Sequence, residues 1–141
     1  MRRYIQITSG CCGNEWWKDM VRTCTVFGEE FEIHCWEDET ETIREALRFG
    51  REVPSDWQGM RVIRGSITLD LIQYLVRLPK PERATGYHMM TPFFTIHFGE
   101  RLMSEHYGAE MILCDPPKGS EASIRKVLEG IGSMACIHED P

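Results

Sequence analysis

The stretch Glu30–Trp36, which reads EFEIHCW, decides the fold of this 141-residue chain. Its first, third and fifth residues are polar, whereas Phe31, Ile33 and Cys35 between them are apolar. Successive side chains of a strand point to opposite faces of a sheet, so this alternation predicts a strand with one buried and one water-facing side. A sheet covered on both faces would show continuous apolar strands instead. We therefore expect a sheet with at least one exposed face, with Trp36 on that face.

Strand-like and helix-like segments alternate on either side of this stretch. The alternation predicts an α/β fold: one layered domain over residues 1–141, with a mixed β-sheet flanked by helices. An α+β sandwich is the alternative. Two prolines, charges and a glycine predict an internal loop over 79–86. The other strands are expected at 4–8, 60–64, 92–98, 110–114 and 134–137, and the helices after Asn14, after Asp38, around Leu71–Val76, over 100–107 and after Ser120.

Composition and charge exclude several functional classes. No stretch approaches the roughly 20 apolar residues that a membrane span needs. The segment after Met1-Arg2-Arg3 is too short and too polar for a secretion signal, so we expect a cytoplasmic protein with its six cysteines reduced. The formal net charge of −6 argues against direct nucleic-acid binding, which requires positive charge.

The acidic residues are concentrated in one segment. Eight of the 22 Asp and Glu residues lie between positions 29 and 45, opposed there only by Arg44, while the rest of the chain holds 14 acidic and 15 basic residues. A negative patch of this kind attracts basic partners and speeds association. We therefore expect a small, non-enzymatic binding protein of the inhibitor or immunity type, which occludes a basic nucleic-acid-binding or toxin site on a partner protein. The expected partner-binding residues are Glu30, Glu32, Trp36, Glu37, Asp38 and Glu41.

The loop Ser9–Asn14 supports an alternative function. It lies between a predicted strand and the start of a predicted helix, where backbone N–H groups and the helix dipole favour anions. The alternative is a phosphate-binding protein or a cysteine-dependent hydrolase, with Gly10, Gly13 and Asn14 around the anion, Cys11 or Cys12 as the nucleophile, and Asp115 as an acid.

Cys11-Cys12-Gly13-Asn14 resembles the C-x-G-N that opens the phosphate loop of low-molecular-weight tyrosine phosphatases. The resemblance covers about half a dozen residues and implies that Asp115-Pro116 supplies the general acid. Trp17 stands where that family has its phosphate-clamping arginine, so the main stabilisation of the transferred group is missing. Gly13-Asn14-Glu15 also resembles the flavodoxin phosphate loop, but Cys12 stands in place of its hydroxyl residue.

The five histidines are scattered along the chain without an H-x-x-x-H spacing. No C-x-x-C pair is present either, so the usual chelating pairs of a zinc site are missing. The sequence therefore predicts neither a metal site nor a cofactor.

Overall fold

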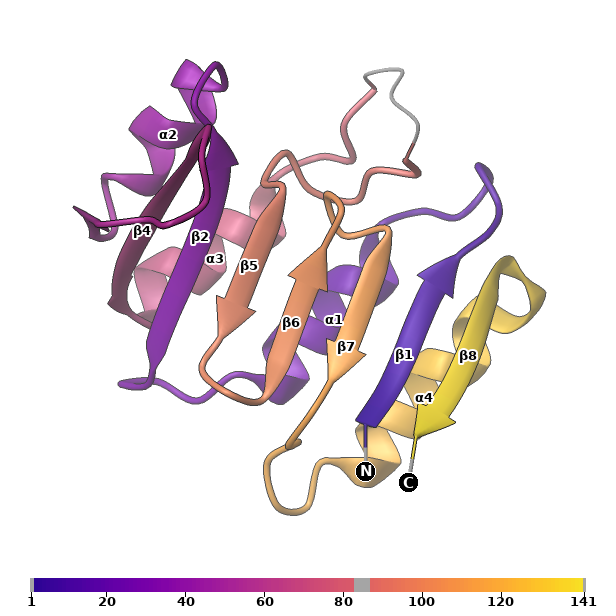
Figure 1. The fold of residues 1–141 in the computed structure, drawn as a ribbon. Helices are drawn as coiled ribbons and strands as arrows, with labels where there is room; N and C mark the ends of the chain where they lie inside the picture. The colour runs from indigo at the N-terminus through magenta and orange to yellow at the C-terminus, as the bar shows by residue number, and fades with distance from the viewer. Residues whose placement is uncertain (1, 83–86, 141) are drawn as a thin grey trace.

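A computed structural model describes residues 2–82 and 87–140, which form one eight-stranded sheet (Figure 1). The strand order across the sheet is β3-β4-β2-β5-β6-β7-β1-β8, and every pair of neighbours is antiparallel. The strands are β1 (Arg2–Ile7), β2 (Glu30–Trp36), β3 (Arg51–Val53), β4 (Met60–Ser66), β5 (Thr95–Phe98), β6 (Leu102–Glu105), β7 (Glu110–Leu113) and β8 (Ala135–Asp140).

Four helices pack on one face of the sheet, the face turned away from the viewer in Figure 1. Among the described residues, no helix covers the other face, which we call the open face. The helices are α1 (Glu15–Cys24), α2 (Thr40–Ala46), α3 (Leu69–Arg77) and α4 (Glu121–Ile131), and the last is followed by a 3₁₀ turn over Gly132–Met134.

Strand β2 lies between β4 and β5, and its alternating residues separate the two faces. Phe31, Ile33 and Cys35 are fully buried beneath the helices. Glu32 and His34, by contrast, are half-buried and lie on the open face. Ile33 is directly opposite Ile63 of β4 and Ile96 of β5, so the apolar positions of three strands are aligned on the same side. The single buried side predicted from the sequence is therefore observed.

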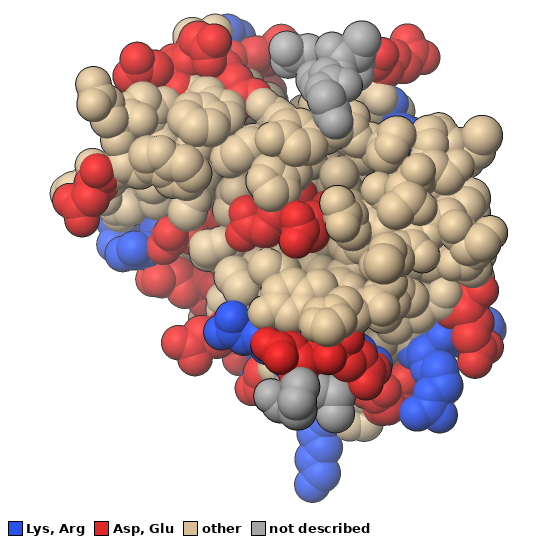
Figure 2. All heavy atoms as spheres, turned by 45° about the vertical axis from the view of Figure 1, so that its right-hand side comes forward, with Lys and Arg blue, Asp and Glu red and all other residues tan. Residues whose placement is uncertain are grey.

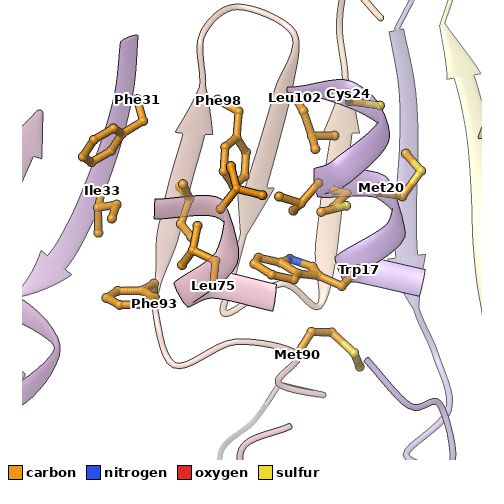
Figure 3. Packing of buried hydrophobic residues seen from close by; sticks show 14 of the residues in the cluster. Trp17, Met20, Cys24, Phe31, Ile33, Leu75, Met90, Phe93, Phe98 and Leu102 are labelled. Atoms are coloured by element: carbon orange, nitrogen blue, oxygen red, sulfur yellow. The ribbon is translucent and has the colours of Figure 1, made fainter. Parts of the chain in front are cut away.

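The core fills the space between the helices and this side of the sheet (Figure 3). Trp17 of α1 and Leu75 of α3 point into the layer that also holds Phe98 and Leu102 of the sheet. The buried Trp17 Nε1 donates a hydrogen bond to Ser104 Oγ at 2.9 Å, so its polar atom is paired inside the apolar layer.

The layered α/β architecture is confirmed, with three differences in detail. The sheet is antiparallel throughout rather than mixed. Hairpins link β3 to β4 and the strands from β5 to β7, and the pairs between strands that are distant in the chain are antiparallel as well. Residues 102–105 form strand β6 instead of part of a helix over 100–107: Gly99, at φ +59°, turns the chain back so that Leu102 pairs with Phe98. The short strand β3 was not predicted. Of the predicted loop, residues 79–82 have no regular structure and residues 83–86 lie outside the described part.

Gly65 of β4 provides a test of how closely the backbone packs. A Cβ atom there would stand 2.6 Å from the carbonyl oxygen of Phe49 and 2.7 Å from the ring of Phe31. We expect Gly65→Ala to lower the free energy of unfolding by about 1–3 kcal/mol, because backbone must shift to make room. Gly13→Ala, whose Cβ would meet nothing within 4 Å, is the matched control. Urea titration measures both, and equal stabilities would contradict the close packing.

Candidate binding face

A second, smaller apolar cluster lies on the open face. Met60, Val62 and Phe94 are buried there beneath partly buried neighbours rather than beneath a helix. Trp36, Val53 and Tyr107 are the neighbours that pack against them. In Figure 2 the view toward this face is dominated by uncharged residues, with Lys and Arg toward its margins. The cluster gives one end of the open face an apolar floor.

Four aromatic rings form a continuous series along this floor, from Trp57 through Trp36 and Phe94 to Tyr107. Trp57 stands edge-on to Trp36 at 5.5 Å between ring centroids, and Trp36 lies 5.0 Å from Phe94. Phe94 in turn contacts Tyr107 at 5.2 Å. Trp57 is 55% exposed, although tryptophan is normally well buried. Exposed aromatic rings on an apolar base are typical of the residues that carry the binding energy of an interface.

Three carboxylates lie beside the rings of Trp36 and Tyr107. A shallow pocket there is lined by Trp36, Glu37, Asp38, Glu39, Gly59 and Tyr107. Glu37 and Asp38 are exposed, and within the described residues neither forms an ion pair. We call Trp36, Glu37, Asp38, Trp57 and Tyr107 the acidic–aromatic patch.

Glu39 holds the patch together. Its Oε1 accepts a hydrogen bond from the backbone N–H of Trp36 at 2.8 Å, and its Oε2 accepts one from the hydroxyl of Tyr107 at 3.0 Å. One carboxylate therefore links the end of β2 to the turn between β6 and β7. The turn itself is tightly constrained, since His106 and Tyr107 both have positive φ angles, of 52° and 60°. Glu39 therefore holds Trp36 and Tyr107 in place relative to each other, whereas Trp57 joins the patch from the loop between β3 and β4.

The other predicted partner-binding residues are placed differently. Glu30 and Glu32 lie on the open face, but Arg64 of β4 pairs with both of them, at 3.3 and 2.9 Å. Glu41 is exposed in the first turn of α2, beyond the end of β2. The acidic segment is thus divided: Arg101 and Arg64 pair with Glu29, Glu30 and Glu32 in its first part. The later carboxylates at positions 37, 38 and 41 form no ion pair with any residue that the structure describes.

The loop Ser9–Asn14 presents carbonyl oxygens to a cation. Lys80 Nζ donates to the carbonyl of Cys12 at 2.6 Å and to that of Gly10 at 3.4 Å. The N–H groups of Cys11 and Cys12 donate to the hydroxyl and carbonyl oxygens of Ser9. Both amides are already used within the loop, so they are not directed at a bound anion.

Asn14 and Asp115 do not join this loop into a catalytic site. Asn14 donates from Nδ2 to the carbonyl of Met90 at 3.2 Å, and its side chain forms no cap bond with α1. Asp115 follows the last residue of β7, and β7 pairs antiparallel with β1. Asp115 therefore lies beside the first residues of β1, whereas Cys11 and Cys12 follow the last residue of β1, at the opposite end of the strand (Figure 1). Gly13 is exposed beside them. The structure therefore does not bring the cysteines and the expected acid together.

Burial also acts against Cys12 as a nucleophile. The side chain is 1% exposed, and burial raises the pKa of its thiol by more than the nearby Lys80 lowers it. A reactive cysteine requires the opposite shift, because the thiolate is the attacking form.

The pH dependence of alkylation tests whether the Cys12 thiol is protected by burial and has a raised pKa. In Cys11→Ser protein, the rate at Cys12 with iodoacetamide is expected to be slow and to keep rising with pH beyond the ~8.5 of a free cysteine. Cys12→Ser protein, which keeps the exposed Cys11, is the control and is expected to react faster. A rate at Cys12 that levels off below neutral pH would restore the nucleophile hypothesis.

Three residues of the candidate site were not predicted from the sequence. Trp57 lies in an irregular loop with no periodic pattern, and Phe94 was assigned to the core without a face. Tyr107 lies in the segment predicted as a helix. Pairing of β2 with β4 and β5 brings Trp57 and Phe94 beside Trp36, and pairing of β5 with β6 brings Tyr107 beside Phe94. A single sequence does not report which strands pair.

None of the described helices has the length and apolar character needed to cross a bilayer. Comparisons with protein-family models, with curated proteins and with solved structures find no match for this chain. The functional argument therefore rests on the geometry of the open face.

Proposed function

We propose that this protein is a non-enzymatic, cytoplasmic binding protein of the inhibitor or immunity type, which covers a basic site on a partner protein with its open face. The observation that carries the proposal is the acidic–aromatic patch, where exposed Trp57 and half-buried Trp36 adjoin the exposed carboxylates of Glu37 and Asp38. A solvated acidic surface alone would not need aromatic rings arranged over an apolar floor.

The chemistry of the patch fits a basic partner surface. Arginine and lysine side chains stack on tryptophan and tyrosine rings, an interaction worth about 0.5–2 kcal/mol depending on solvation. The adjacent carboxylates of Glu37 and Asp38 would pair with the same cationic groups. Basic surfaces of this kind bind nucleic acid through its phosphates. A protein that occupies such a surface excludes nucleic acid from it by steric and electrostatic occlusion.

Several charged residues of the helical face pair within or between elements, such as Arg3 of β1 with Glu121 of α4 and Arg22 with Asp19 of α1. On the open face, aromatic rings over an apolar floor adjoin Glu37 and Asp38, which form no ion pair within the described part of the chain. This combination supports the open face as the interface.

Charge reversal tests the electrostatic part of the proposal. Proteins captured from the native host by the wild-type chain are identified, and association with the captured protein is followed by surface plasmon resonance at several salt concentrations. Reversing Glu37, Asp38 and Glu41 to Lys is expected to lower the association rate constant by about 10-fold or more at low salt, and by less at high salt. The control reverses Asp19, Asp70 and Glu129, which are exposed on three helices. Equal rates for the two triple variants would contradict the proposal.

Removal of the exposed tryptophan tests the apolar part. Trp57→Ala is expected to weaken binding of the same partner by at least about 1–2 kcal/mol, mainly through faster dissociation, as for interface residues that carry much of the binding energy. Phe27→Ala is the matched control, because Phe27 is 62% exposed and lies outside the patch. Dissociation rates from the same sensor surface provide the comparison, and equal effects of the two substitutions would argue against the patch.

A further inference from the structure

Two histidines and two glutamates meet near the middle of the open face. His34 of β2 is diagonal to His97 of β5, because Glu32 is directly opposite His97 and Thr95 is directly opposite His34. The two imidazole rings are 5.1 Å apart. Glu105 of β6 lies on the far side of His97 and is also half-buried.

Each glutamate presents one oxygen to an imidazole while a separate donor holds the other oxygen. Glu32 Oε1 lies 2.7 Å from His34 Nε2, and its Oε2 accepts hydrogen bonds from Arg64 at 2.9 and 3.1 Å. Glu105 Oε1 lies 3.2 Å from His97 Nε2, while its Oε2 accepts from the Thr95 hydroxyl at 2.9 Å. Both carboxylates are therefore oriented before any ligand arrives.

From this geometry we propose that Glu32, His34 and His97 bind a divalent transition-metal ion, with zinc as the best fit. One ligand atom from each residue lies within 4.8 Å of the other two, and of the residues that the structure describes only these three form such a group. Ligands around tetrahedral zinc stand about 3.3 Å apart, given bonds of about 2.0–2.2 Å to nitrogen and oxygen. Small side-chain rotations would bring these atoms from their present spacing to that value.

The donor types select the class of metal. Imidazole nitrogen favours zinc and its first-row neighbours, whereas calcium and magnesium favour oxygen ligands alone. Three protein ligands leave at least one position for water or for a group from another molecule. Glu105 Oε1 contacts Nε2 of His97, so Glu105 acts as a positioning residue for an ion bound through Nδ1: a carboxylate on one imidazole nitrogen fixes the ring whose other nitrogen binds the metal.

The charges of the cluster favour a cation. Glu32 and Glu105 contribute two carboxylates, and Arg64 is the cation paired with one of them. This site does not depend on the proposed partner, so its failure would leave that proposal unchanged.

Calorimetric titration of the full chain with zinc chloride under reducing conditions tests the proposal. We expect one ion per chain, with His34→Gln and His97→Gln each weakening binding by more than the roughly 10–100-fold expected for Glu105→Gln. His138→Gln, on the edge strand β8, is the control and is expected to bind as the wild type does. Glutamine keeps the side chain polar, and circular dichroism confirms folding. Equal affinity in the wild type and both histidine variants, or no saturable binding by the folded wild type, would overturn the site.

Two further measurements keep the test independent of the variants. Addition of zinc to isotope-labelled wild-type protein is expected to shift the imidazole NMR signals of His34 and His97 while leaving His138 unchanged. Cobalt as the probe is expected to give an absorption spectrum without thiolate charge-transfer bands, because no cysteine belongs to the site. Unchanged His34 and His97 signals, or a thiolate spectrum, would place the metal elsewhere.

Discussion

The two-residue alternation along β2 is the constraint on which the rest of the structure depends. Its register against β4 and β5 places Phe31 and Ile33 in the core and leaves Glu32, His34 and Trp36 on the open face. A shift of one residue would exchange the two sets, burying charged groups and exposing the apolar ones. The same pairing therefore determines both the stability of the fold and the composition of the candidate binding face.

Local pattern in the sequence predicted most of the elements, because helix caps and strand alternation are short-range signals. The helices beginning near Asn14 and Ser120 and the strand around Ile33 are observed. The segment Leu102–Glu105 was misassigned because the short stretch between the turn-forming Gly99 and Gly108 fits either a short helix or one arm of a hairpin. The sequence also offered no direct signal for antiparallel pairing throughout the sheet, which depends on contacts between distant segments.

In the candidate sites, too, proximity of residues close in sequence could be predicted, whereas contacts between distant segments could not. Trp36, Glu37 and Asp38 are close in sequence, so their proximity could be predicted, whereas the contribution of Trp57 required the fold. His34 and His97 are 63 positions apart by residue number, and only the pairing of β2 with β5 brings them together. Arg64, which pairs with both Glu30 and Glu32, is likewise brought close by strand pairing, so the acidic segment was predicted as one patch although the fold divides it.

Carbene footprinting of the complex with the captured partner tests the central claim most directly, because it maps the covered surface without any substitution. If the open face is the interface, labelling falls at Trp36, Trp57 and Tyr107 on complex formation and is unchanged on α1 and α4. Protection of α1 and α4, with undiminished labelling of the open face, would contradict the account.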